Sequence, residues 1–422
     1  MRYLYTAFFY LITPFILLRL LWRSRLAPAY AKRWQERFGF FGHVRAQDSI
    51  WVHAVSVGET LAALPMIKSL MQRYPDTPIV VTTTTPTGSE RVKAALGDSV
   101  LHVYAPYDMP GCVGRFLNRV QPKLAIIMET ELWPNTVAAC HRRGIPVVLA
   151  NARLSAKSAK GYQRFSALAA PMLSQLSVVG AQHHDDAQRF YDLGLSQQQC
   201  QVTGSIKFDI TLGEELRSAA QDLHNDWADC SGRPILLAAS THLGEDEKVL
   251  QGFHRILEQQ PTTLLVLVPR HPERFDKVAD LCRQQFTIQR RSEGGRIEGG
   301  TQVLVGDTMG EMMTFFGACD MAFMGGSWIE SGGHNMIEPA AWGKPVFTGP
   351  SLFNFAEVSR LLIEAEGMGV VDTPEALASE VCRLIENPDQ AKAMGENALA
   401  VADANRGALD RLLAIIDQQF NR

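Results

Sequence analysis

The sequence predicts an α/β protein with two doubly wound lobes and an apolar segment ahead of them. Short β-branched runs alternate with helix-length amphipathic stretches from Ile50 onward, which is the pattern of βαβ units around a parallel sheet. A polar stretch over residues 211–233 interrupts this alternation once, after which it starts again. At 422 residues the chain is also longer than one hydrophobic core usually supports, so two domains are expected.

The first lobe is expected to contain a parallel sheet with helices between its strands. The predicted strands are Ile50–Val55, Ile79–Thr83, Val100–Tyr104, Leu124–Met128, Val147–Ala150, Val178–Gly180 and Gln201–Thr203. The stretch 211–233 lacks strand signals and ends in Ser231-Gly232-Arg233-Pro234, so we interpret it as a linker with a linking helix.

The second lobe repeats the same alternation. Its predicted strands are Ile235–Ala239, Leu264–Val268, Val303–Val305, Met321–Met324 and Val346–Phe347, and the tail Pro388–Phe420 is predicted to be helical. The expected organisation is an anchor over residues 1–25, a first domain over 26–210, a linker over 211–233 and a second domain over 234–422. Two doubly wound lobes imply a cleft between them, with ligands beyond the carboxyl ends of the strands.

The cysteines and the distribution of charge indicate in which cellular compartment the protein works and what kind of surface it contacts. The seven cysteines are scattered and never form a CxxC pair, which favours a reducing compartment and argues against a zinc or disulfide framework. Residues 1–47 hold eight basic residues and only Glu36 as an acid, a net charge of +7, so the remainder carries −10 of the total of −3. A basic region behind an apolar stretch indicates an anionic membrane surface rather than nucleic acid.

The N-terminal segment is almost wholly apolar from Tyr3 to Leu18 and reaches Trp22 if Arg19 snorkels. This is close to the ~20 residues that a membrane-spanning helix needs. A spanning anchor and a helix lying in the interface both fit, whereas the arginines after the apolar run make a cleaved signal peptide unfavourable. In either arrangement the basic residues are expected on the cytoplasmic side of the membrane.

The strongest local motif of the second lobe is GGSWIESGGHNMIEPAAWGKPVFTGP, Gly325–Pro350. Glycines allow a ligand close to the backbone, and Asn335 is placed to cap a helix whose first turn carries Glu338. Such a helix N-terminus offers N–H groups to a phosphate, and Glu338 is suited to accept hydrogen bonds from ribose hydroxyls. The alternative is that Glu338 is only a charge favoured by the helix dipole.

Two further strand ends of the second lobe should lie at the same edge of its sheet. In the segment PRHPERF, Arg270 can pair with a phosphate through its planar guanidinium, although a surface arginine is usually just solvated. In GDTMGE, the turn N–H groups of Met309 and Gly310 can hold a phosphate or a base.

Three strand ends of the first lobe carry candidate catalytic residues. Glu59 of SVGET opens a helix after the first strand, where a carboxylate can remove a proton from an attacking hydroxyl or can simply be a helix-start residue. Glu129 and Glu131 of METELWPN follow the fourth strand; we do not expect them to clamp a metal, because alternate residues of an extended segment face opposite ways. Lys207 of TGSIKFD can neutralise negative charge on a leaving phosphate.

Taken together, these segments resemble the 3-deoxy-D-manno-octulosonic acid (Kdo) transferases of Gram-negative bacteria. SVGET, TPTGSERV, METELWPN, NARLS, TGSIKFD, PRHPERF, GDTMGE and GGHN with the following Glu338 occur in that order over nearly the whole chain, and LYTAFFYLITPF at the N-terminus also fits. The resemblance implies a GT-B fold, a CMP-Kdo donor and a lipid A precursor as acceptor, at the cytoplasmic face of the inner membrane. It implies neither a metal nor a cofactor.

The resemblance also implies roles for individual residues. Glu59 resembles the family's general base, and Glu129 and Lys207 its transition-state stabilisers. The residues that match the family's CMP contacts are Pro269, Arg270, Met309, Gly310, Glu311, Asn335, Met336, Ile337 and Glu338. The reaction implied is an inverting transfer in which an acceptor hydroxyl, deprotonated by Glu59, attacks the anomeric carbon of Kdo opposite CMP.

Two other interpretations remain at this point. A non-hydrolysing sugar-nucleotide epimerase uses the same two-lobed architecture, although it would not need a membrane segment. A non-catalytic membrane scaffold with a degenerate nucleotide site is the second.

Overall fold

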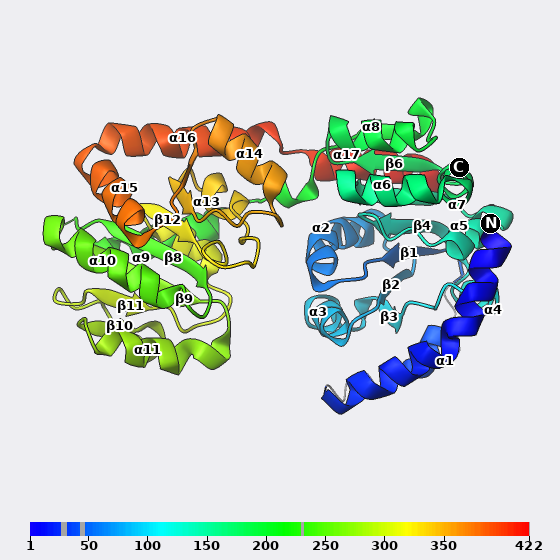
Figure 1. The fold of residues 1–422 in the computed structure, drawn as a ribbon, viewed down its shortest axis with the longest axis horizontal. Helices are drawn as coiled ribbons and strands as arrows, with labels where there is room; N and C mark the ends of the chain where they lie inside the picture. Colours follow the sequence, from blue (N-terminus) through cyan, green and yellow to red (C-terminus); the bar gives the residue numbers. More distant parts are fainter. Residues whose placement is uncertain (27–31, 43–46, 229–231, 422) are drawn as a thin grey trace. The chain divides into compact units, whose positions relative to one another are not determined.

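A computed structural model of the 422-residue chain describes residues 1–26, 32–42, 47–228 and 232–421. Residues 27–31, next to the predicted boundary between the anchor and the first domain, lie outside the described residues. So do residues 229–231, near the predicted end of the linker. The chain divides into two compact units (Figure 1). Unit 1 comprises Met1–Asp209 and Gly407–Arg422, and unit 2 comprises Ile210–Arg406.

Unit 1 is built on a parallel sheet of order β3-β2-β1-β4-β5-β6-β7. Its strands are β1 (Ser49–His53), β2 (Ile79–Thr83), β3 (Leu101–Tyr104), β4 (Pro122–Met128), β5 (Val147–Ala152), β6 (Val178–Ala181) and β7 (Cys200–Val202). All strands predicted for the first lobe are confirmed. The central strands are buried almost throughout, whereas the edge strands β3 and β7 are only partly buried.

Helices cover both faces of this sheet. They are α2 (Val57–Arg73), α3 (Pro86–Leu96), α4 (Pro110–Val120), α5 (Pro134–Arg142), α6 (Ala156–Arg164), α7 (Ser166–Leu173), α8 (His184–Asp192) and α17 (Ala408–Phe420). Their starts follow local chemistry: Ser56 and Thr85 accept hydrogen bonds from backbone N–H groups at the starts of α2 and α3, and proline opens α3, α4 and α5.

Unit 2 repeats the architecture with a parallel sheet of order β10-β11-β9-β8-β12-β13-β14. Its strands are β8 (Ile235–Thr241), β9 (Leu264–Pro269), β10 (Ile288–Arg290), β11 (Val303–Val305), β12 (Met321–Met324), β13 (Val346–Thr348) and β14 (Met368–Val370). The sequence did not predict β10 and β14. Both are short edge strands that are only partly buried, so they lack the continuous apolar run that marks the central strands.

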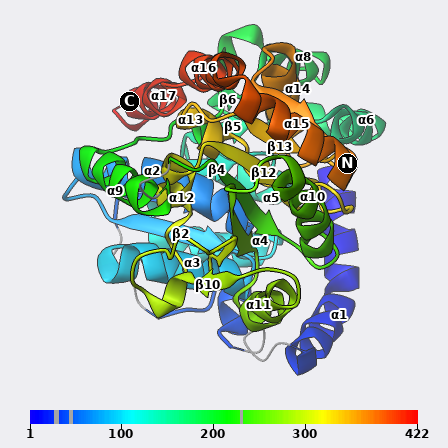
Figure 2. The same ribbon diagram turned by 90° about the vertical axis from the view of Figure 1, so that its left-hand side faces the viewer.

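The helices of unit 2 complete the second α/β layer structure (Figure 2). They are α9 (Glu214–Ala228), α10 (Asp246–Gln259), α11 (Phe275–Arg283), α12 (Met312–Ala318), α13 (Ile337–Ala341), α14 (Ala356–Glu364), α15 (Pro374–Glu386) and α16 (Pro388–Ala404). The sequence assigns α9 to a linker, but it packs against α12 and buries Trp227 within unit 2. The sequence also places α17 in the second domain, whereas the contacts place it in unit 1.

The N-terminal segment is one helix, α1 (Arg2–Leu26), with Pro14 inside it. Over Arg2–Arg25 it is long and apolar enough to cross a membrane. One side of α1 contacts the rest of unit 1 near the starts of α4 and α5 (Figure 1). The opposite side is exposed.

Candidate functional site

Glu59 lies buried at the start of α2, directly after β1. Its carboxylate accepts a hydrogen bond from the Val55 backbone N–H at 2.8 Å and another from the Ser56 hydroxyl at 2.8 Å. Burial raises the pKa of Glu59, although these two hydrogen bonds oppose the rise. A carboxylate with a raised pKa is a better proton acceptor at neutral pH than an exposed one.

Glu129 and Lys207 come together at the carboxyl end of the same sheet. The Lys207 ammonium lies 3.3 Å from the Glu129 carboxylate, and both side chains are half-buried. Glu129 directly follows β4 and has a φ of 52°, a left-handed conformation that a non-glycine residue adopts only at a strain cost of about 1–3 kcal/mol. Strain of this kind concentrates at functional sites, where the surrounding structure holds a side chain in place.

Glu131 also belongs to this group, although it is not among the site residues predicted from the sequence. Its pKa is raised to about 6, first by burial and then by the negative charge of Glu59. The alternation of an extended segment does not apply here, because the chain leaves β4 at Met128 and Glu129 turns it sharply. Glu59, Glu129 and Glu131 therefore form a cluster of three interacting carboxylates with Lys207 as a neighbouring cation.

Unit 2 contains a pocket of about 260 Å³ at the carboxyl ends of its strands. Its lining includes apolar side chains, those of Val268, Phe275, Met312 and Phe315, and polar ones, those of Ser240, Arg270, His334, Asn335 and Glu338. An apolar cavity with a few convergent polar groups is the usual form of a small-molecule site.

The structure brings most of the predicted donor residues to this pocket. Pro269, Arg270, Met309, Gly310, Asn335 and Glu338 line it. The Asn335 side chain accepts a hydrogen bond from the Ile337 backbone N–H at 3.3 Å and donates one to Glu338 at 3.1 Å. The predicted N-cap is wrong by one residue, because α13 has its N-cap at Met336 and no side-chain hydrogen bond closes it. Burial raises the pKa of Glu338.

Three predicted donor residues do not line the pocket. The Met336 and Ile337 side chains are fully buried in the core, so only their backbone groups are available to a ligand. Glu311 pairs with Arg291 at 2.7 Å and accepts a hydrogen bond from Thr308. This pairing lowers the pKa of Glu311 and fixes the turn that presents Met309 and Gly310.

The sequence did not reveal a loop that organises the pocket, residues 242–245 (HLGE) between β8 and α10. Glu245 is fully buried, and its carboxylate accepts hydrogen bonds from the backbone N–H groups of Gly326, Ser327 and Trp328 at 2.6–3.0 Å, and from that of His242 at 2.9 Å. These N–H groups form an anion-binding nest that the protein fills with its own carboxylate. The sequence did contain a signal for Glu245, since this acid lies in a polar loop at the end of a predicted buried strand.

Glu245 changes the interpretation of the glycine-rich segment. Its glycines are predicted to allow a ligand close to the backbone, but the N–H groups of Gly326 and Ser327 are already occupied by the Glu245 carboxylate. Trp328 is buried and donates its indole N–H to the Val371 carbonyl at 2.7 Å, so this part of the loop is structural.

A pair of histidines borders the same pocket. The Nε2 atoms of His242 and His334 lie 2.9 Å apart, and the two rings are stacked. Burial lowers the pKa of His334 to about 4 and also lowers the pKa of His242, so both rings are neutral at neutral pH. One ring must then donate the shared hydrogen bond and the other accept it.

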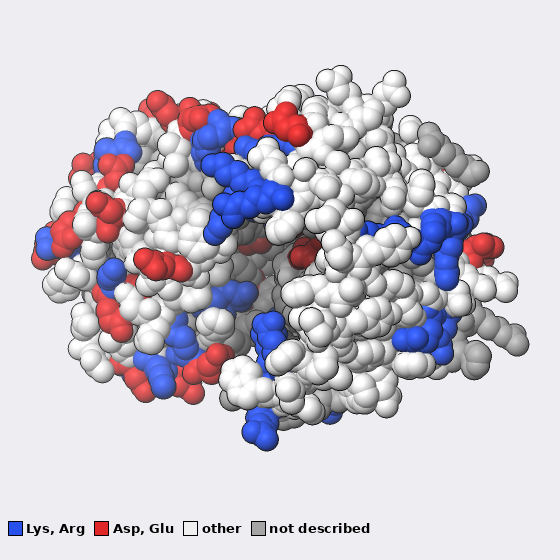
Figure 3. Space-filling model, turned by 45° about the vertical axis from the view of Figure 1, so that its right-hand side comes forward, with Lys and Arg blue, Asp and Glu red and all other residues white. Residues whose placement is uncertain are grey.

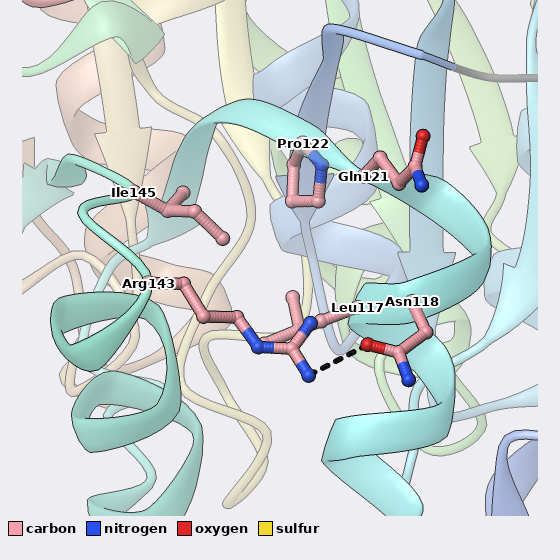
Figure 4. A pocket seen from close by; sticks show the side chains of 6 residues that line it. All are labelled: Leu117, Asn118, Gln121, Pro122, Arg143 and Ile145. Carbon is pink, nitrogen blue, oxygen red and sulfur yellow. Dashed lines mark hydrogen bonds between the residues drawn. The ribbon is translucent and has the colours of Figure 1, made fainter.

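A second cavity, of about 300 Å³, lies in unit 1 between the end of α4 and the start of β4 (Figure 4). Arg143 reaches across it and donates a hydrogen bond to the Asn118 side chain at 2.8 Å. Pro122, which opens β4, also lines this cavity. It therefore lies at the amino end of the strand whose carboxyl end carries Glu129, and it is not part of the carboxylate site.

Comparison with known proteins decides the family. A family model described as 3-Deoxy-D-manno-octulosonic-acid transferase (kdotransferase) matches residues 32–210, and one described as Glycosyl transferases group 1 matches residues 247–401. The 3-deoxy-D-manno-octulosonic acid transferase of Haemophilus influenzae is 44% identical over 100% of this chain and 99% of its own length. The chain belongs to the Kdo transferase family. It is therefore a glycosyltransferase of lipopolysaccharide synthesis, as the ordered motifs predict.

Other matches agree with this assignment. The Kdo transferase of Bordetella pertussis is 36% identical over 94% of this chain and 95% of its own length. Among solved structures, a putative UDP-N-acetylglucosamine 2-epimerase from Listeria monocytogenes has a TM-score of 0.58 with 16% identity, over 89% of this chain and 97% of its own. At that identity the likeness shows a shared GT-B-like fold alone, whereas the Kdo transferases match in sequence throughout.

Proposed function

We propose that this chain transfers Kdo from CMP-Kdo to a lipid A precursor, with inversion at the anomeric carbon, at the cytoplasmic face of the inner membrane. The observation that carries the proposal is the arrangement of Glu59, Glu129 and Lys207 at one sheet edge in a chain 44% identical to a Kdo transferase throughout. The N-terminal helix supports the choice of a lipid acceptor.

In the proposed mechanism Glu59 accepts the proton of the attacking acceptor hydroxyl. Burial raises its pKa, and the fixed hydrogen bonds from Val55 and Ser56 orient the carboxylate before the acceptor binds. The transition state has oxocarbenium character, so negative groups stabilise the anomeric carbon and positive groups stabilise the leaving phosphate. We assign these stabilising roles to Glu129 and Lys207.

The pocket of unit 2 is proposed to hold the CMP portion of the donor. Its apolar lining residues suit the pyrimidine ring, and Glu338, held by Asn335, suits the ribose hydroxyls. Arg270 is exposed at the edge of the pocket and supplies a guanidinium for the phosphate.

The direct test is transfer by the purified full chain. Incubation with CMP-Kdo and a radiolabelled lipid A precursor in detergent is expected to give a product heavier by Kdo and dependent on both substrates. If no product forms in detergent or in vesicles, the proposed reaction is wrong. A membrane scaffold with a degenerate site would still bind CMP but would give no transfer.

Glu59→Ala separates catalysis from donor binding. Loss of the proton acceptor is expected to lower kcat by about 10²–10⁴-fold. CMP binding, measured by calorimetry, should be unchanged because Glu59 does not line the donor pocket. An unchanged transfer rate would remove Glu59 from the mechanism.

A further inference from the structure

We propose that α1 does not cross the membrane but lies in the plane of one leaflet, held along one side by unit 1 and covered by anionic lipid on the other. This inference deepens the membrane attachment of the proposed function and rests on it. It also decides between the spanning and the interfacial interpretation of the N-terminal segment.

The side of α1 that faces unit 1 is fixed by specific contacts. The Thr6 hydroxyl and the Asn135 side chain are hydrogen-bonded at 2.9 Å, and the Thr13 hydroxyl donates to the Met109 sulfur at 3.4 Å. Phe9 packs edge-on against Trp133, with 6.4 Å between ring centroids. These contacts lie on successive turns of one helix face, as neighbours at i, i+3 and i+4 do.

The surface that receives α1 is rigid. Asp108 is buried, and its carboxylate accepts hydrogen bonds from the backbone N–H groups of Asn135 and Thr136 and from the Thr136 hydroxyl, at 2.7–2.9 Å. The Asn135 amide also donates to the Asp108 carbonyl at 2.8 Å. The Asn135 side chain is therefore held in position by Asp108 as well as by α1.

Length excludes a crossing while these contacts persist. If residues 5–13 lie against unit 1, only residues 14–26 are left to enter the membrane. At a rise of ~1.5 Å per residue they extend for about 20 Å. The hydrocarbon core is about 30 Å thick, so the remaining part of α1 is too short to span it.

The opposite side of α1 is an apolar stripe suited to lipid. Its members recur at the three- and four-residue spacing of one helix face and are each 57–73% exposed: Leu4, Phe8, Leu11, Phe15, Leu18 and Trp22. We call these six residues the outer stripe. Apolar residues occur on both sides of α1. The side that faces unit 1 is covered by protein, so the outer stripe needs a different apolar medium, which lipid provides.

Charge identifies the lipid as anionic. Arg2, Arg19, Arg23 and Arg25 lie on α1, which has no acidic residue. On the face drawn in Figure 3, acidic side chains are sparse over unit 1, whereas acidic and basic side chains are interleaved over unit 2. Basic groups beside an apolar stripe attract lipid phosphates and anionic headgroups.

The surface that receives α1 also lies next to the catalytic carboxylates. Trp133, which contacts Phe9, belongs to the loop that carries Glu129 and Glu131. An acceptor whose acyl chains stay in the leaflet beside α1 can then present its sugar to the carboxylate cluster without leaving the membrane.

Cysteine labelling in intact cells tests the orientation. Tyr3→Cys, at an 83% exposed position near the helix start, is probed with a membrane-impermeant maleimide. If α1 lies in the plane, label should appear only after the cells are lysed; labelling in intact cells would place the N-terminus outside and overturn the inference. Leu243→Cys, at a 77% exposed position of unit 2, is the control that shows on which side of the membrane unit 2 lies.

Cross-linking tests whether α1 stays docked in the membrane. Oxidation of membranes that contain the Thr6→Cys/Asn135→Cys variant should close a disulfide, because the native side chains are in hydrogen-bond contact. The matched control Leu4→Cys/Asn135→Cys, whose first cysteine is on the outer stripe, should stay reduced. Equal cross-linking of both pairs, or of neither, would overturn docking. Failure of the parent protein to sediment with membranes would instead refute membrane attachment itself.

Discussion

At the scale of single residues, the carboxylate cluster of unit 1 controls when Glu59 can act as a base. Glu59 must be deprotonated to accept a proton, so activity should fall as the pH falls through its raised pKa. Glu131 adds a second ionisation with a pKa of about 6, which burial and the negative charge of Glu59 raise. Because repulsion between two carboxylates is mutual, an ionised Glu131 also opposes the ionisation of Glu59.

Glu131→Gln removes that negative charge while keeping the shape of the side chain. The pKa of Glu59 should then fall, so the acid limb of the pH profile of kcat/KM is expected to move to lower pH. Glu131 also affects the stability of the fold. Because its pKa is raised in the folded state, the stability that its protonated form contributes is present at low pH and is lost as the pH rises through about 6. The variant should therefore melt at a higher temperature than the parent at pH 8. An unmoved acid limb would contradict the coupling.

Glu245 is expected to position the donor site without touching the donor. Glu245→Gln places an amide N–H₂ group against backbone N–H groups and removes charge-assisted hydrogen bonds worth about 1.5–3 kcal/mol each. We expect the KM for CMP-Kdo to rise at least about tenfold, with a smaller change in kcat. Glu247→Gln, an exposed neighbour, is the control and should leave both parameters unchanged. If the two variants behave alike, the organising role of Glu245 is wrong.

At the scale of elements, α17 shows how the end of the chain stabilises unit 1. Ala408, Leu412, Leu413, Ile415 and Ile416 are all buried in the core that also contains β1, β4 and β5 residues. Asp209 accepts hydrogen bonds from the Gly407 and Leu409 backbone N–H groups at 2.6 and 2.5 Å, so the start of α17 is fixed beside the loop of Lys207.

Ile416→Ala is expected to destabilise unit 1 by about 2–5 kcal/mol, since it leaves a cavity in a closed core. Unit 2 has its own core and should keep its CMP affinity. Differential scanning calorimetry with and without CMP measures this: an early transition should appear that CMP does not shift. A single transition that CMP stabilises would show that the units do not unfold separately.

The elements also show what the sequence could and could not predict. The central strands and the segments that carry Glu59, Glu129, Lys207 and Arg270 are predictable, because buried runs and polar strand ends are local patterns. The edge strands β10 and β14 and the side on which α17 packs depend on contacts between distant segments. Glu245 was missed for the same reason, since its partners lie about 80 residues further along the chain.

At the scale of the whole molecule, membrane binding should have an electrostatic and an apolar part that can be separated. The +7 charge of residues 1–47 draws the protein to anionic lipid, and salt screens that attraction. Burial of the outer stripe is not screened by salt. The parent protein should therefore stay bound to vesicles of phosphatidylethanolamine and phosphatidylglycerol when the salt concentration is raised.

Leu11→Glu/Phe15→Glu places two charges in the outer stripe and leaves the docked side of α1 unchanged. We expect this variant to bind the same vesicles weakly at low salt and to be released at high salt, in flotation experiments with the full chain. Phe353→Glu/Val370→Glu makes the same change at two exposed apolar positions of unit 2 and should bind like the parent. Because the carboxylate cluster is untouched, transfer to a detergent-solubilised acceptor should persist in both variants, whereas transfer to vesicle-bound acceptor should fall only in the first. Equal release of the two variants would mean that general surface charge, and not the outer stripe, determines membrane binding.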